Sequence, residues 1–128
     1  YTGSRIAELG PVQARIAEAA ACVEFAETVI RRDWTDLEEA VERGEFPTME
    51  TKLRWKRNAA FATSLAVRSI DTLMPAAGAA GLSLLQPLQR QFRDIHAASS
   101  HIGLTWDVHG AAYGQSALGL PSPAGFLL

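Results

Sequence analysis

The 128-residue sequence contains a single cysteine, Cys22, and this excludes an intrachain disulfide. Such scarcity of cysteine is typical of proteins in the reducing cytoplasm, where we expect this protein to reside. Cys22 lies in the apolar stretch AAACVEFA, which indicates a small buried side chain rather than a reactive thiol.

Long apolar runs are also missing from the sequence. No run approaches the roughly 20 residues that span a bilayer, and no basic start followed by an apolar region indicates a secretory signal. The 12 Lys and Arg residues are outnumbered by 14 Asp and Glu residues, for a net charge of -2, and they are scattered among the acids. We therefore expect neither a membrane nor a nucleic acid as partner.

The spacing of apolar residues predicts an all-α protein, an up-and-down four-helix bundle with two long helices and two shorter ones. The first long helix begins at Pro11, where a missing N–H costs nothing, and stops at Gly44. The second follows the capping residue Thr48 and is closed by Pro75. The sequence shows no period-two strand pattern and no internal repeat.

One face of the first long helix is predicted to be apolar and buried, because apolar residues recur there at steps of three and four. These residues are Val12, Ile16, Ala19, Val23, Ala26, Ile30, Trp34, Leu37 and Val41.

Pro87 begins a third helix, which either continues to His101 or breaks near Ser99 and Ser100. The last helix is predicted to carry two stripes. One permits close packing of helices or subunits because its members are small, apart from an aspartate: Gly103, Asp107, Gly110, Gly114 and Ala117. The other has the mixed polarity of a pocket or an interface: His101, Thr105, His109, Ala112 and Ser116.

All three histidines, His96, His101 and His109, fall between Pro87 and Leu118. The sequence contains no HExxH motif, no paired Glu-x-x-His and no second cysteine, so we expect no metal site. It also has no GxSxG, GxGxxG or Walker motif to indicate a hydrolytic triad or a phosphate loop. Residue types alone therefore favour a structural role for His101.

The segment PLQRQFRDIHAASSHIGLTWDVHGAAYGQSALG resembles the C-terminal helical domain of flavoproteins with the acyl-CoA dehydrogenase fold. More narrowly, it resembles the two-component flavin-dependent monooxygenases built on that fold. The run PVQARIAEAAACVEFAETVIRRD is similar to the first long helix of that domain, and an AAGAAG loop precedes the helix with the Arg93-Asp94 pair. Where some acyl-CoA dehydrogenases have a catalytic glutamate in a YEGT motif, this sequence reads SSHIGLTWD, which disfavours their chemistry.

The resemblance implies an oxidoreductase that hydroxylates a small aromatic substrate. In this family a separate flavin reductase supplies reduced FMN or FAD, which reacts with O2 to give a C4a-hydroperoxide. His101 is implied as the catalytic residue, which either hydrogen-bonds near the flavin or deprotonates a phenolic substrate. Ile102 is implied to pack beside the flavin, and the loop around Ala79 and Ala80 to approach it.

The resemblance also implies that residues 1–128 form the C-terminal helical bundle domain of a longer flavoprotein that assembles as a homotetramer. The start at Tyr1 rather than Met indicates a fragment or a processed chain. We expect this domain alone to be inactive, because the flavin site is shared between domains and subunits. Two alternatives stay open: an acyl-CoA-dehydrogenase-like oxidoreductase whose base lies in another domain, and a non-catalytic helical oligomerisation module.

Overall fold

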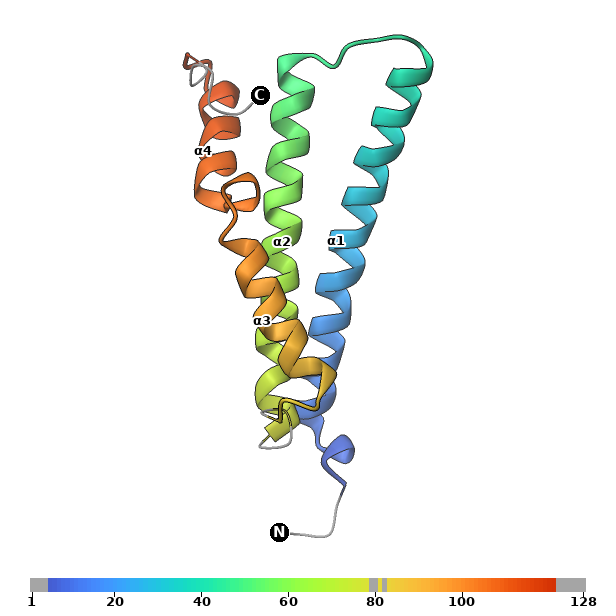
Figure 1. Cartoon of the computed structure of the whole chain (residues 1–128), viewed down its shortest axis with the longest axis vertical. Helices are drawn as coiled ribbons and strands as arrows, with labels where there is room; N and C mark the ends of the chain where they lie inside the picture. Colours follow the sequence, from blue (N-terminus) through green and yellow to red (C-terminus); the bar gives the residue numbers. More distant parts are fainter. Residues whose placement is uncertain (1–4, 79–80, 82, 122–128) are drawn as a thin grey trace.

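The computed structural model describes residues 5–78, 81 and 83–121, and this part of the chain consists of helices and loops without a strand (Figure 1). Its α-helices are two long ones followed by two short ones, which confirms the predicted all-α class. They are α1 (Gly10–Glu42), α2 (Met49–Ala77), α3 (Pro87–Ser99) and α4 (Trp106–Ala117), with short 3-10 helices at η1 (Ile6–Glu8) and η3 (Ile102–Leu104).

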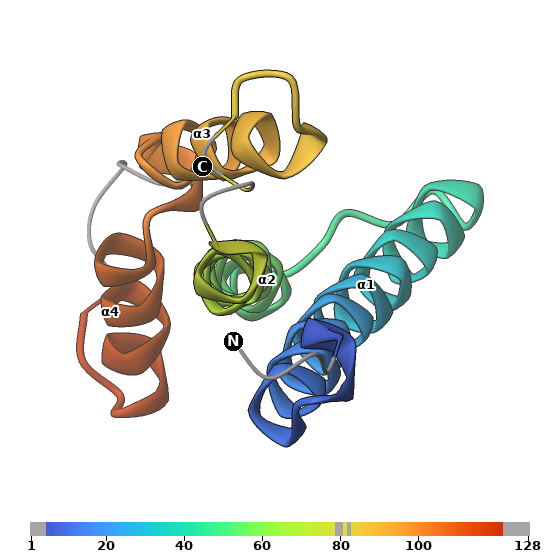
Figure 2. The same cartoon turned by 90° about the horizontal axis from the view of Figure 1, so that it is seen from below.

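Helix α2 lies at the centre of the fold and packs against α1, α3 and α4. Viewed along its axis, α1 lies on one side of α2, whereas α3 and α4 lie on the other (Figure 2). Helices α1 and α2 are antiparallel, and α3 and α4 follow one another back along α2 (Figure 1). Two short helices in tandem, α3 and α4, therefore run along α2 where a single long helix could have done so.

Local signals account for most of the helix ends. Pro11 occupies the first turn of α1, and Gly44 follows the end of α1 with φ +66°, a conformation that favours glycine. The Thr48 side chain caps α2 by accepting a hydrogen bond from the Thr51 N–H at 3.2 Å. Pro75 does not close α2 as predicted: the helix continues to Ala77 and ends at Gly78, where φ is +58°.

The interface between α1 and α2 is made mainly of small apolar side chains. On α1 the buried apolar side chains are all small and include Cys22, as predicted, whereas α2, which packs against three helices, also buries Leu53 and Ile70. The buried alanines of these two helices are Ala19, Ala40, Ala60 and Ala62.

The prediction that one face of α1 is buried is wrong for the larger residues of that face. Ala19 is buried, but Ile16, Val23, Trp34 and Val41 are each at least half exposed, at 50–68%. Helix α1 carries two adjacent apolar stripes, and the stripe of smaller residues is the one that packs against α2. The stripe of larger residues stays on the outside of the chain.

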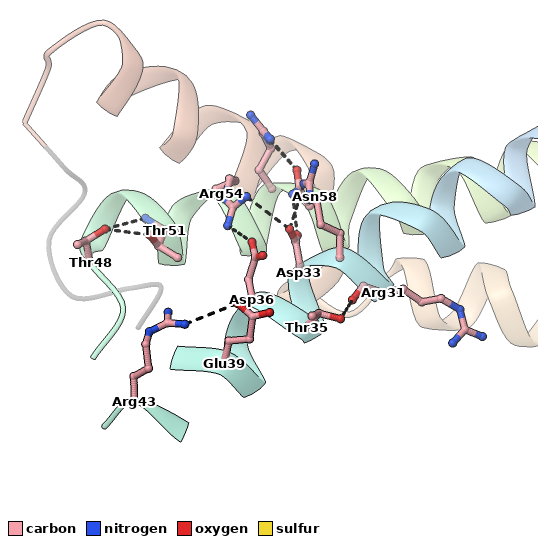
Figure 3. A network of polar contacts seen from close by, with 12 residues as sticks. Arg31, Asp33, Thr35, Asp36, Glu39, Arg43, Thr48, Thr51, Arg54 and Asn58 are labelled. Carbon is pink, nitrogen blue, oxygen red and sulfur yellow. Dashed lines mark hydrogen bonds and ion pairs between the residues drawn. The ribbon is translucent and has the colours of Figure 1, made fainter. Parts of the chain in front are cut away.

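A polar cluster lies inside the α1–α2 interface (Figure 3). The carboxylate of Asp33, 8% exposed, accepts a hydrogen bond of 2.6 Å from Nδ2 of Asn58 on α2. It also lies 3.9 Å from the Arg54 guanidinium, which donates to Asp36 at 2.6 Å. The Asn58 amide oxygen in turn accepts from Arg57. A buried charge is tolerated because it is paired and hydrogen-bonded.

Asp33→Ala is expected to destabilise the chain by about 1–3 kcal/mol, because it leaves the buried Asn58 amide without its acceptor. Urea unfolding followed by far-UV circular dichroism measures the loss. The matched control is Glu27→Ala, which breaks an exposed pair with Arg31 one turn away on the same helix and is expected to cost at most about 0.5 kcal/mol. Equal losses in the two variants would contradict a structural role for the buried cluster.

Candidate functional site

The predicted catalytic histidine lies at the joint between α3 and α4. Helix α3 ends at Ser99, η3 covers Ile102–Leu104, and α4 begins at Trp106. The chain therefore breaks after Ser99, which decides between the two possibilities left open by the sequence. It also corrects the two predicted stripes: Gly103, His101 and Thr105 precede α4 rather than lying on one of its faces.

His101 caps η3, and its backbone is held on both sides. Its N–H donates to the Ala98 carbonyl at 3.0 Å, and its own carbonyl accepts from the Leu104 N–H at 2.8 Å and the Thr105 hydroxyl at 3.1 Å. The imidazole is exposed, and its Nδ1 accepts a hydrogen bond of 3.1 Å from the Gly103 N–H. The ring is thus held at one nitrogen in a side chain that is exposed to solvent.

The next residue in the chain, Ile102, adds an apolar side chain to the surface of the joint. Ile102 is 53% exposed although it is fully aliphatic. Its carbonyl faces inward, where Nε2 of His109 lies 3.1 Å away. An exposed aliphatic group next to an exposed imidazole suits the edge of a flat heteroaromatic ring, which offers both apolar faces and polar ring atoms.

His109 is the most buried of the three histidines, at 2% exposure. It lies in the first turns of α4, and its Nε2 contact with Ile102 ties α4 to the η3 turn. Its Nδ1 is buried and has no hydrogen-bond partner among the described residues. The sequence placed His109 in a pocket or interface stripe but did not reveal this contact, because the contact exists only when the chain turns between the two residues.

Trp106 docks the start of α4 on α2, and the sequence analysis missed it. Its ring lies 5.2 Å from the ring of Phe61 in a tilted arrangement, and it packs over Gly110. The Trp-x-x-x-Gly spacing was the available signal, since residues four apart on a helix share a face. Nearby, a surface cavity of about 270 Å³ is lined by residues of α2, α3 and the joint, among them Thr63, Ser99 and Leu104.

The remaining predicted residues lie elsewhere. His96 is bonded through Nε2 to Asp71 of α2 at 2.9 Å, a contact that ties α3 to α2. Asp94 pairs with Arg90 of its own helix on the exposed surface. The loop residues Ala79 and Ala80 lie outside the described residues. Within the described ranges, no three His, Cys, Asp or Glu side chains come together to hold a metal, and no helix there is both long and apolar enough to cross a bilayer.

The geometry defines a helical domain with a polar candidate site at the joint between two helices. Sequence comparison then identifies the family. Residues 1–106 match the family described as "Acyl-CoA dehydrogenase, C-terminal domain". The chain belongs to this family.

Its relatives include oxygenase components. The chain is 36% identical over 122 residues to the FADH(2)-dependent resorcinol hydroxylase, oxygenase component, of Rhizobium sp. (strain MTP-10005), with 91% of this chain and 30% of that protein covered. It is 32% identical to the p-hydroxyphenylacetate 3-hydroxylase, oxygenase component, of Acinetobacter baumannii, with 96% and 29% covered. The chain therefore spans about a third of the length of these relatives and matches their C-terminal domain.

A solved structure shows the same fold. XiaF from Streptomyces sp., in complex with FADH2 and glycerol, superposes with a TM-score of 0.90 at 28% identity, covering 100% of this chain and 33% of that one. The predicted resemblance to oxygenase components of two-component flavin-dependent hydroxylases is thereby confirmed.

Two glycines of α4 provide a test of how this helix packs. An added Cβ at Gly114 would meet no described atom within 4 Å, whereas at Gly110 it would lie 3.0 Å from Cε2 and 3.1 Å from Cζ2 of Trp106. Gly114→Ala is expected to stabilise the chain by about 0.5–1 kcal/mol through helix propensity. Gly110→Ala is expected to gain less or to destabilise, because the Trp106 ring must move. Urea unfolding compares the two, and an equal gain would show that Trp106 does not rest on Gly110.

Proposed function

We propose that residues 1–128 form the C-terminal helical domain of a longer flavoprotein, the oxygenase component of a two-component aromatic hydroxylase. The observation that carries this proposal is the similarity of nearly the whole chain to two oxygenase components that act on phenolic compounds according to their names. Reduced flavin, when bound, activates O2 so that one oxygen atom is transferred to the aromatic ring. The cofactor is reduced FMN or FAD, and a separate flavin reductase supplies it.

The exposed edge of the α3–α4 joint supports this proposal. His101 offers a ring nitrogen to a polar atom of flavin or substrate, and Ile102 offers an apolar contact beside it. Both side chains belong to one short turn held by backbone hydrogen bonds, so their relative placement is fixed. We propose His101 as the catalytic residue and His101, Ile102, Ala79 and Ala80 as the flavin contacts from this domain.

The outer stripe of α1 supports assembly through this domain. Ile16, Val23, Trp34 and Val41 leave a row of large apolar side chains exposed along the helix. A homotetramer of the complete protein, in the cytoplasm, would cover such a row with neighbouring subunits. The same arrangement would complete a flavin site to which each chain contributes only one wall.

His101→Ala in the longer protein is expected to lower hydroxylation of a phenolic substrate on the order of 10²-fold, because a preorganised polar contact at the reacting centre is lost. Product yield and rate are measured with chemically reduced FMN or FAD supplied directly, which removes the reductase from the assay. The matched control is His96→Ala, since the His96 side chain is bonded to Asp71 of α2 rather than to the η3 turn, and the variant is expected to leave the rate within a few fold.

An acyl-CoA assay with an artificial electron acceptor separates the competing enzyme class. Acyl-CoA turnover without any hydroxylation would overturn the proposed function in favour of a dehydrogenase. Full hydroxylation by His101→Ala would leave the hydroxylase in place and remove His101 from its mechanism.

A further inference from the structure

We propose that Gly103 and His109 are positioning residues that hold His101 as a hydrogen-bond donor, with its ring proton on Nε2, and so exclude it as a base. The part of this proposal that rests on the proposed function is that the N–H donor faces flavin or substrate. It narrows the two roles that the sequence left open for His101, hydrogen bonding near the flavin and deprotonation of a phenol.

The tautomer of His101 follows from its contact with Gly103. The backbone N–H of Gly103 can only donate, so Nδ1, 3.1 Å away, accepts with its lone pair. A neutral imidazole that accepts at Nδ1 carries its proton on Nε2. The exposed edge of the ring therefore presents an N–H group. A base at this edge would need the opposite tautomer, in which Nδ1–H points at the Gly103 N–H and the two hydrogens collide.

Glycine at position 103 leaves room for this contact, because it has no side chain. A Cβ built at Gly103 would lie 3.2 Å from Nδ1 and 3.3 Å from Cε1 of His101, closer than ordinary van der Waals contact. The φ angle of Gly103 is not in the left-handed region, so the requirement for glycine comes from the ring above it rather than from the backbone. With a larger residue at position 103 the imidazole must shift, which weakens its hydrogen bond with the amide.

His109 fixes the turn on which this contact depends. A carbonyl oxygen only accepts, so Nε2 of His109 donates to the Ile102 carbonyl at 3.1 Å. The Thr105 N–H, at 3.5 Å, is a much weaker donor to the same oxygen. The His109 bond is therefore the stronger of the two contacts to the Ile102 carbonyl, and competing water has little access to the His109 side chain, which is 2% exposed.

The chemical consequence concerns the group that the site recognises. An imidazole N–H at the exposed edge recognises an acceptor atom, such as a carbonyl oxygen or ring nitrogen of flavin or the ionised oxygen of a phenol. It stabilises negative charge on that acceptor, and Nε2 in this tautomer has no lone pair with which to take a proton. Ionisation of a phenolic substrate then falls to a group other than His101.

The tautomer is measured on the 128-residue chain itself, without flavin or turnover. In a long-range ¹H–¹⁵N correlation spectrum of histidine-labelled chain, His101, assigned by its loss in His101→Ala, is expected to show a single Nε2–H tautomer at neutral or higher pH. Gly103→Ala and His109→Leu are expected to shift its nitrogens toward the averaged values of a freely exchanging imidazole. Gly114→Ala is the matched glycine control, and His109→Gln, which keeps an N–H donor, is expected to restore the wild-type signals.

A His101 spectrum that is averaged in the wild-type chain, or unchanged in both Gly103→Ala and His109→Leu, overturns the proposal. Far-UV circular dichroism identifies a variant that has lost its fold. If His109→Leu unfolds, Gly103→Ala, at a half-buried position in the turn, still decides the outcome.

Turnover in the longer protein tests the donor role separately. His101→Gln keeps a donor but has no basic nitrogen, so it is expected to retain more hydroxylation than His101→Ala, and Gly103→Ala is expected to lower the rate by up to about 100-fold. If Gln is as inactive as Ala, and a substrate with an already ionised phenol restores both, His101 is a base and the proposal is overturned. If the tautomer behaves as expected but no His101 variant affects hydroxylation, the positioning stands and the proposed function of His101 fails.

Discussion

The buried hydrogen bond between Asp33 and Asn58 is the contact on which the arrangement of the helices depends. A buried carboxylate is tolerated here only because it is hydrogen-bonded to a partner. If α1 slid along α2 by one turn, Asp33 would lose its hydrogen bond with Asn58 and remain a buried charge without that partner. The amide oxygen of Asn58 accepts from Arg57, whose guanidinium lies 4.0 Å from the centre of the Tyr113 ring on α4. One polar chain thus runs from α1 through α2 to the helix that carries His109.

The candidate site inherits its geometry from this arrangement. Helix α4 is held on α2 by Tyr113 near its end and by Trp106 at its start, where the ring packs on Phe61. Between these points His109 reaches back to the η3 turn, and the turn presents His101. The proposed catalytic side chain is exposed, yet each step behind it is packed or hydrogen-bonded. Such support is what a polar group at a reacting centre requires.

The sequence predicted those features that depend on local chemistry. The Thr48 cap, the Gly44 stop and the number and order of helices follow from residues near each position. The face of α1 that packs on α2 was predicted wrongly, because two adjacent apolar stripes satisfy the same helical period and only the partner chooses between them. The contacts of His101 were missed for a similar reason: small and polar residues from Ser99 to Thr105 fit a helix as well as a turn. The resemblance, rather than the pattern, indicated His101.

The division of α1 into a stripe of small residues and a stripe of large ones has a consequence for conformational entropy. Alanine has no side-chain rotamers to lose, so the contact of α1 with α2 through Ala19 and Ala40 forms with little ordering of side chains. The rotamer-rich side chains, such as Ile16 and Trp34, keep their freedom in the single chain. If another surface covers them in the proposed assembly, their ordering and the accompanying release of water fall in that step, so the entropy change of this helix would be divided between folding and association.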